Sequence, residues 1–130
     1  MDIEILTLCD AATDYQGRLC ILGVFDTIFA HNLPAVHPYC AAALRIRFEK
    51  IEQGNHSLTV HFINDDGTMI IPELKGEFAV QMPGQEQQGT INLVLGLQNL
   101  NFTAYGQYEI KLAIDNITQK TIPFWIKPPA

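Results

Sequence analysis

The stretch Gly106-Gln-Tyr-Glu-Ile-Lys-Leu-Ala-Ile-Asp115 decides the fold of this chain. Aromatic or aliphatic residues occupy every second position from Tyr108 to Ile114, and most of the positions between them are polar. A period of two residues predicts a β-strand with one face in a hydrophobic core and the other in water. The segments on either side should therefore supply strands that pack against this one.

Strand periodicity recurs along the rest of the chain, and no segment has a convincing helical pattern. Turn residues separate the apolar segments about every 8 to 12 positions, which is typical of a sandwich or barrel. We predict an all-β fold: an antiparallel β-sandwich, immunoglobulin-like or jelly-roll-like, with about eight or nine strands. Besides 106–115, the expected strands are 3–12, 19–30, 40–50, 56–63, 68–71, 78–82, 91–97 and 121–127.

Three local signals refine this prediction. The segment 31–39 should be a loop, because Pro34 and Pro38 remove backbone donors and restrict the residues before them. The apolar phase shifts by one between Leu97 and Leu100, which we interpret as the chain crossing from one sheet to the other. Pro123 should confine the last strand to a sheet edge.

The segment 3–30 is more apolar than burial of a single sheet face requires. Isoleucine, leucine, valine and phenylalanine occupy both parities of the two strands expected there. Either a second layer of the same chain covers the additional apolar face, or a partner subunit does.

Composition mainly excludes classes of protein and does not identify one. A chain of 130 residues is expected to form a single domain, 1–130. Its net charge is −6 and its eight Lys and Arg residues are scattered, so nucleic acid and anionic membranes are not expected partners. No apolar run reaches the roughly 18 residues of a membrane span, and no basic region of a signal peptide is present, so we expect a cytoplasmic location. Three cysteines without tight spacing are expected to be reduced, buried thiols.

Three motifs carry a resemblance to a known family. They are Leu8-Cys-Asp-Ala-Ala12, Gly17-Arg-Leu-Cys-Ile-Leu-Gly-Val-Phe-Asp26 and the segment 102–115. Together they resemble a family of small uncharacterised bacterial proteins in which an Asp-Ala strand pairs with a Leu-Gly-x-Phe-Asp strand, and a Gly-x-Tyr strand comes near the end. The resemblance implies a β-sandwich and a domain of unknown function, with no catalytic residues to carry over.

A more general similarity connects the chain with immunoglobulin-like domains. The Gly106-Gln-Tyr108 turn is similar to the one that leads into a late strand of such domains. Ile110 stands where the second disulfide cysteine would be, and Trp125 lies in the last strand rather than a central one. The inter-sheet disulfide of antibody domains is therefore not expected.

Reactive side chains do not form a catalytic pattern. Ser57 is the only serine and lacks the Gly-x-Ser-x-Gly turn of serine hydrolases. His37 and Cys40 are close in sequence, but Pro38 and the start of a strand should turn them apart, which favours an inert buried thiol. Zinc needs three or four converging ligands, usually with a paired spacing, and none is present. We therefore predict a protein that is not an enzyme, with no metal site and no cofactor.

Two hypotheses about function remain. The first is a non-catalytic intracellular module that binds a protein partner or self-associates as a homo-oligomer, motivated by the apolar segment 3–30 and by the last strand. The second is a small-molecule or carbohydrate-binding sandwich that uses the 31–39 loop. The candidate binding residues are His31, His37 and Tyr39 in that loop, and Trp125, whose side chain should face away from its apolar neighbours on the last strand.

Overall fold

The computed structural model describes residues 1–130 and contains nine strands and one short 3-10 turn. The elements are β1 (Asp2–Tyr15), β2 (Arg18–Phe25), β3 (Thr27–Phe29), β4 (Ala35–Glu49), η1 (Lys50–Glu52), β5 (Gly54–Asn64), β6 (Leu74–Val80), β7 (Gln88–Phe102), β8 (Gly106–Ile114) and β9 (Ile117–Lys127). They form two stacked sheets, which confirms the predicted all-β sandwich. No helix in the structure is long and apolar enough to cross a membrane.

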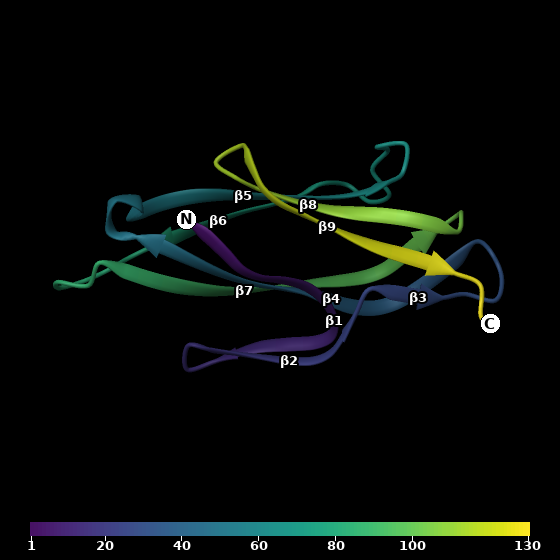
Figure 1. Ribbon diagram of the computed structural model, residues 1–130, viewed down its shortest axis with the longest axis horizontal. Helices are drawn as coiled ribbons and strands as arrows, with labels where there is room; N and C mark the ends of the chain where they lie inside the picture. Colours follow the sequence, from purple (N-terminus) through teal and green to yellow (C-terminus); the bar gives the residue numbers. More distant parts are fainter.

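The nine strands are divided between two sheets. One sheet has four strands in the order β2-β1-β4-β7, and the other has five in the order β3-β9-β8-β5-β6. All pairs are antiparallel except the short parallel pair of β3 and β9. In Figure 1, β5, β8 and β9 form the upper layer, and β4 and β7 lie beneath them.

The main core lies between the sheets and is centred on β8. The four alternating residues from Tyr108 to Ile114 are each at most 3% exposed, as the sequence pattern predicts. Tyr108 stacks against Phe124 with ring centroids 5.4 Å apart, and its hydroxyl donates a 2.7 Å hydrogen bond to the Ala104 carbonyl. This bond satisfies the one polar group of a buried aromatic side chain and anchors the turn that precedes β8.

The hairpin of β1 and β2 adds a third layer. β1 pairs with β4 up to Cys9 and with β2 from Leu8 onward, so its second half leaves β4 and curls under the four-stranded sheet (Figure 1). Asn92 of β7 holds the turn of this hairpin against the sheet. Its side-chain amide donates to Asp14 Oδ1 at 3.0 Å and to the Gly17 carbonyl at 3.1 Å.

A second small core lies between this hairpin and the outer face of the sheet. Its fully buried residues are Cys9, Ala41 and Ala43, and partly buried apolar residues of β1, β2 and β7 pack around them. The alanines fit this position because a larger side chain would hold the hairpin away from the sheet. One face of the apolar segment 3–30 is thus covered by the chain itself, and the pairing of β1 with β2 is the one that the family resemblance implies.

The predictions for strand 19–30 and for loop 31–39 need correction. The expected strand 19–30 is divided at Asp26, where the chain passes from the end of β2 to β3 in the opposite sheet. The Asp26 carbonyl accepts a 2.8 Å hydrogen bond from the Trp125 backbone N–H, so the crossing is held to β9. The predicted 31–39 loop is shorter than expected, because β4 begins at Ala35 and pairs with β7 from there.

The phase shift between Leu97 and Leu100 has a different cause from the one predicted. β7 stays in one sheet throughout, and the ladder between β4 and β7 is interrupted only opposite Pro38. There Asn99 adopts a left-handed conformation, with φ 53°, which reverses the direction of the following side chains. Both Leu97 and Leu100 consequently reach the main core without a change of sheet.

The remaining differences lie at the margins of the five-stranded sheet. Segment 68–71 contributes a single bridge, Ile63 to Met69, rather than a strand. Pro123 lies on a part of β9 that pairs only with β8, whereas β3 covers the other side of β9 from Trp125 to Lys127. The last strand is therefore an edge at Pro123, as predicted, and an interior strand at its end.

Candidate interaction surface on strand β2

Strand β2 has an open backbone edge. It is the terminal strand of its sheet and pairs with β1 on one side only. Its eight residues, Arg18-Leu-Cys-Ile-Leu-Gly-Val-Phe25, contain no proline and a single charge at the first position. Proteins usually protect an open edge with charges, proline or a covering segment, and β2 has almost none of these devices.

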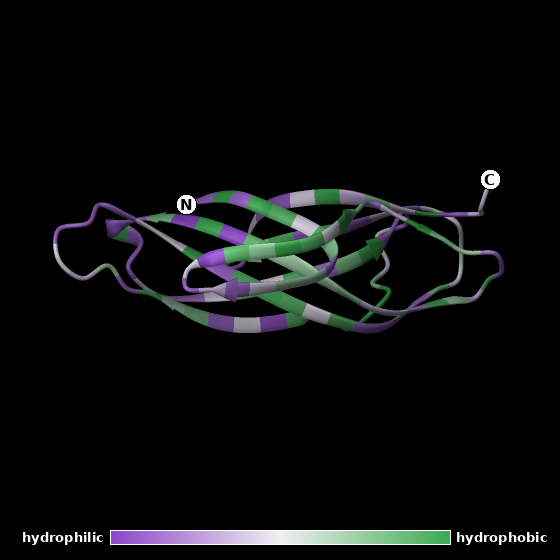
Figure 2. Cartoon of the chain, turned by 90° about the horizontal axis from the view of Figure 1, so that it is seen from below, coloured by the Kyte–Doolittle hydropathy of each residue, from purple (hydrophilic) through white to green (hydrophobic).

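Exposed apolar side chains accompany this open edge. Leu22 is 69% exposed and Val24 is 64% exposed. Cys20 is also exposed, so the expectation of three buried thiols is wrong for this residue, which lies on the uncovered face of the hairpin. Figure 2 views the molecule from this side and shows hydrophobic green along β2 in front, with purple near the hairpin turn. The opposite face of the hairpin packs on the second small core, so Leu22 and Cys20 lie on the part of the segment 3–30 that the chain does not cover.

The other three edge strands differ from β2. β3 is only three residues long, although its Phe29 is 63% exposed. β6 carries Lys75 and Glu77 in its seven residues. β7 is uncharged, but every exposed residue on it is glycine, threonine or a side-chain amide, and its large apolar residues are at least partly buried. An open edge and exposed aliphatic side chains therefore occur together on β2.

A depression of about 460 Å³ lies beside the end of β2, where the chain crosses between the sheets. Asp10, Val24, Phe29 and His37 are among the residues that line it. Gly23 has φ +69°, and a Cβ placed on it would lie 2.4 Å from Asp10 Oδ2. The Asp10 carboxylate thus occupies the space that a side chain would take at this point of β2.

The four candidate binding residues are distributed over the molecule. His31 is exposed in the short loop after β3, and Tyr39 is an exposed residue of β4 whose ring a Cβ on Gly96 of β7 would contact. His37 lies on β4 and lines the depression, with its ring centroid 5.9 Å from that of Phe25. Trp125 is half-buried on β9, with Lys127 Nζ 5.7 Å from its ring centroid. Of the four, only His37 lines the depression.

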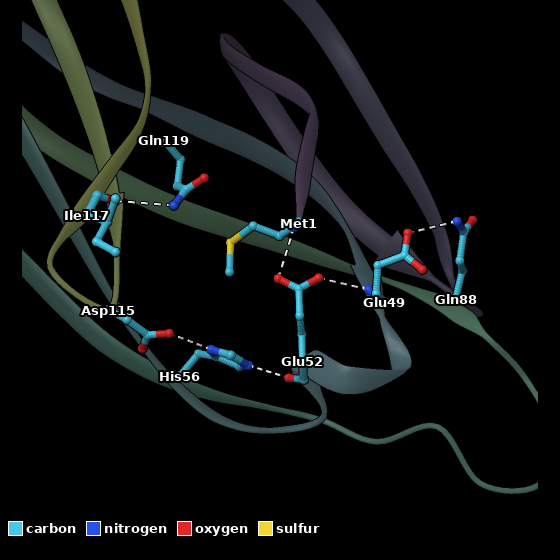
Figure 3. Close-up of polar contacts among 8 residues, drawn as sticks. All are labelled: Met1, Glu49, Glu52, His56, Gln88, Asp115, Ile117 and Gln119. Carbon is cyan, nitrogen blue, oxygen red and sulfur yellow. Dashed lines mark hydrogen bonds and ion pairs between the residues drawn. The ribbon is translucent and has the colours of Figure 1, made fainter.

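A polar cluster that the sequence analysis missed lies at one end of the sandwich (Figure 3). His56 Nδ1 lies 2.6 Å from Asp115 Oδ2, and His56 Nε2 faces the Glu52 carbonyl. The Glu52 carboxylate in turn accepts a 2.9 Å hydrogen bond from the amino terminus. Asp115 and the amino terminus are each more than 50 positions from their partners, and the only available signal was that His56 falls on the inward parity of its strand.

The cluster holds His56 as an imidazolium. A carboxylate and a carbonyl oxygen only accept, so both ring nitrogens must donate. The hydrogen bond to Asp115 and then the one to the Glu52 carbonyl raise the pKa of His56 above its ordinary value. The His56 hydrogen bond, together with the Ser57 backbone N–H, lowers the pKa of Asp115.

These contacts describe a structural role rather than a catalytic triad. A general base needs an unprotonated nitrogen directed at a nucleophile, and here the Glu52 carbonyl occupies Nε2. Cys40 is fully buried, and burial raises the pKa of its thiol to about 11, which opposes thiolate formation. No three His, Cys, Asp or Glu side chains are grouped closely enough to hold a metal ion.

The fold and this surface define an all-β sandwich in which one open edge strand exposes aliphatic side chains. The chain belongs to a family of unknown function (DUF6941), whose model matches residues 4–127. Among solved structures, it is similar to the Pseudomonas fluorescens alkylpurine DNA glycosylase AlkC bound to DNA containing an abasic site analog. That similarity has a TM-score of 0.45 and 8% identity, and covers 97% of this chain and 30% of the glycosylase. A search of curated proteins found no match.

Proposed function

We propose that this protein is a non-catalytic binding module that works by protein association, with a second copy of the same chain adding its β2 strand to the open β2 edge. The observation that carries the proposal is the combination, on β2, of an unpaired edge with exposed Leu22 and Val24. Pairing would satisfy the backbone groups of that edge and place cross-strand neighbours of the other copy beside both side chains, which lowers their exposure to water.

The geometry favours association through β2 over the other edges. Two antiparallel β2 strands would join two four-stranded sheets into one continuous sheet of eight, with an interface that is the same patch on both copies. Each cross-strand contact of an aliphatic side chain in such a pair contributes roughly 0.2–1 kcal/mol. β7 offers the same kind of backbone edge without exposed aliphatic side chains, so its pairing would lack this contribution.

The test is sedimentation velocity and native mass spectrometry of the purified chain at micromolar concentration. We expect a dimer for the wild type, and at least a hundredfold weaker association for Leu22→Lys, because a charge on an edge strand opposes strand pairing. The matched control is Ala79→Lys on β6, which is also exposed and on an edge strand and should leave the dimer unchanged. A monomeric wild type, or equal loss in both variants, would overturn the proposal.

A second candidate function is small-molecule or carbohydrate binding in the depression beside β2. The observation that favours it is that Asp10 and His37 line a hollow of about 460 Å³ with Phe29, which is 63% exposed. Native mass spectrometry of protein purified gently from its own host would then show a monomer with additional mass. His37→Ala should remove that mass and leave the melting temperature nearly unchanged.

A further inference from the structure

Two charged side chains close to the β2 edge have no partner within the chain. Arg18 is exposed at the start of β2, and its guanidinium forms no ion pair or hydrogen bond with another residue. By contrast, Arg45 and Arg47 both bind Glu4 at about 3 Å. The Asp10 carboxylate is also exposed and without an ion pair, although it is held in a defined position against Gly23.

The position of Asp10 brings its carboxylate to β2. Asp10 belongs to β1, but its side chain covers Gly23, where a Cβ would be 2.4 Å from Oδ2. Adjacent strands are about 4.8 Å apart, so a carboxylate lying over β2 is one strand spacing from any strand that pairs with the open edge. A residue with a side chain at position 23 would exclude the carboxylate from this place.

Opposite charges thus stand near the two ends of one edge strand. Arg18 and Gly23 are five positions apart on β2, about 16 Å at the rise of a strand, so Arg18 does not reach Asp10 of its own chain. Antiparallel pairing of two β2 strands about residue 21 would place Arg18 of each copy opposite Val24 of the other. That position lies next to Gly23 and the Asp10 carboxylate above it.

We propose that in the β2-paired dimer Arg18 of each copy forms an ion pair with Asp10 of the other copy, so that this charge pair sets the antiparallel register. The inference rests on the proposed function, because it requires association through β2. The pair forms twice in a symmetric dimer, once at each end of the paired strands. It also accounts for the single charge on an otherwise uncharged edge, since parallel pairing would leave both arginines without a carboxylate.

The experiment measures the dimer dissociation constant by sedimentation velocity for Arg18→Glu, for Asp10→Lys and for an equimolar mixture of the two variants. Each variant alone places like charges together at both ends and should dissociate at least tenfold more readily than the wild type. In a mixed dimer, the two substituted side chains, a glutamate and a lysine, would meet at one end, while the natural Arg18 and Asp10 meet at the other. The mixture should therefore recover a heterodimer of nearly wild-type affinity.

Two controls keep the result decisive. Circular dichroism establishes that each variant is folded; if Asp10→Lys is not, Asp10→Asn replaces it in a double-mutant cycle with Arg18→Gln. Adding the second neutral substitution should then cost no further affinity. A wild-type dimer whose variants associate normally, or whose mixture is not rescued, would overturn the ion pair and leave β2 pairing intact. A wild type that is already monomeric would instead remove the proposed function.

Discussion

Strands β2 and β6 are both edge strands, of eight and seven residues, but the side chains that they expose to solvent differ in character. β6 carries Lys75 and Glu77, and Lys75 binds Glu73 at 3.0 Å beside His61. β2 presents Leu22 and Val24, with its single charge at the end. Both edges leave one row of backbone groups unpaired, and only β6 has charged side chains along its length that oppose pairing with another chain.

The comparison of β2 with β6 distinguishes charged side chains that are paired within the chain from those that are not. The ionic contacts around β5 and β6 are internal, because each joins residues of the same chain. Near β2, Arg18 and Asp10 have no internal partner, and in the proposed dimer they serve association. Substitutions at the two edges should therefore have different consequences for stability and for association.

The largest effect on stability is expected from the glycines of the two edges. Gly23→Ala should lower the free energy of unfolding by about 2 kcal/mol, because alanine is strained at φ +69° and its Cβ would displace Asp10. Gly76→Ala on β6 is the matched control: nothing lies within 4 Å of its Cβ and its φ is not positive. It should raise stability by about 0.5 kcal/mol. Urea denaturation monitored by circular dichroism measures both.

The outcome at Gly23 also tests the role of Asp10. If the comparison holds, Gly23→Ala weakens association as well as stability, because it moves the carboxylate away from β2. Equal stability of the two alanine variants would show that the close contact between β1 and β2 is unimportant for the fold.

The next effect concerns His56, on the sheet that contains β6. The pKa of His56 is raised above its ordinary 6.5, so its contribution to stability is complete below pH 6.5 and is lost as the pH rises through the raised pKa. The pKa of Asp115 is lowered from its ordinary 3.8, so its contribution is present above pH 3.8 and is lost as the pH falls through the lowered pKa. The contact stabilises the fold most between these limits.

His56→Gln should therefore reduce the free energy of unfolding by about 1 kcal/mol near pH 5.5, and by progressively less as the pH rises through the raised pKa of His56. The value is below the roughly 1.5–3 kcal/mol of a hydrogen bond to a charged group because the Asp115 side chain is 46% exposed and solvent screens the contact. Urea titrations at several pH values check the difference between variant and wild type. A difference that stays constant across this range would mean that His56 contributes packing against Phe48 and Phe78 rather than charge.

The smallest effect on stability is expected when the charges of β6 are removed. Lys75→Val combined with Glu77→Val should change the free energy of unfolding by less than about 0.5 kcal/mol, because both residues are exposed. Made in a Leu22→Lys background, the pair should nevertheless restore association by opening a second apolar edge. Sedimentation velocity compares this variant with Leu22→Lys alone, and a persistent monomer would show that an uncharged edge is not sufficient for pairing.

Sequence periodicity predicted the sandwich because alternation is a local property of an extended chain. Tyr108 to Ile114 alternate in sequence and are buried in the structure, and the positions of most other strands followed from the same rule. Two of the errors concern the point at which the chain changes sheet. Asn99 reverses the side-chain direction within β7, so the apolar pattern shifts although the strand stays in one sheet. The actual change of sheet, at Asp26, produces no shift in the apolar pattern.

The candidate site was less predictable than the fold for a different physical reason. The apolar excess of the segment 3–30 indicated a covered face, but whether the cover was the chain itself or a partner depended on how the hairpin curls. His37 follows from sequence as a candidate, whereas the place of Asp10 over Gly23 depends on the pairing of two strands.

By itself, the sequence determined that this chain forms strands, where most of them lie and which faces they bury, because these properties depend on residues two positions apart. The strand order was decided only by the tertiary structure. It left β2 with an open edge, covered one face of its hairpin with alanines, and joined His56 to Asp115 across 59 positions of the chain. Such contacts depend on packing between distant segments, which no local pattern records.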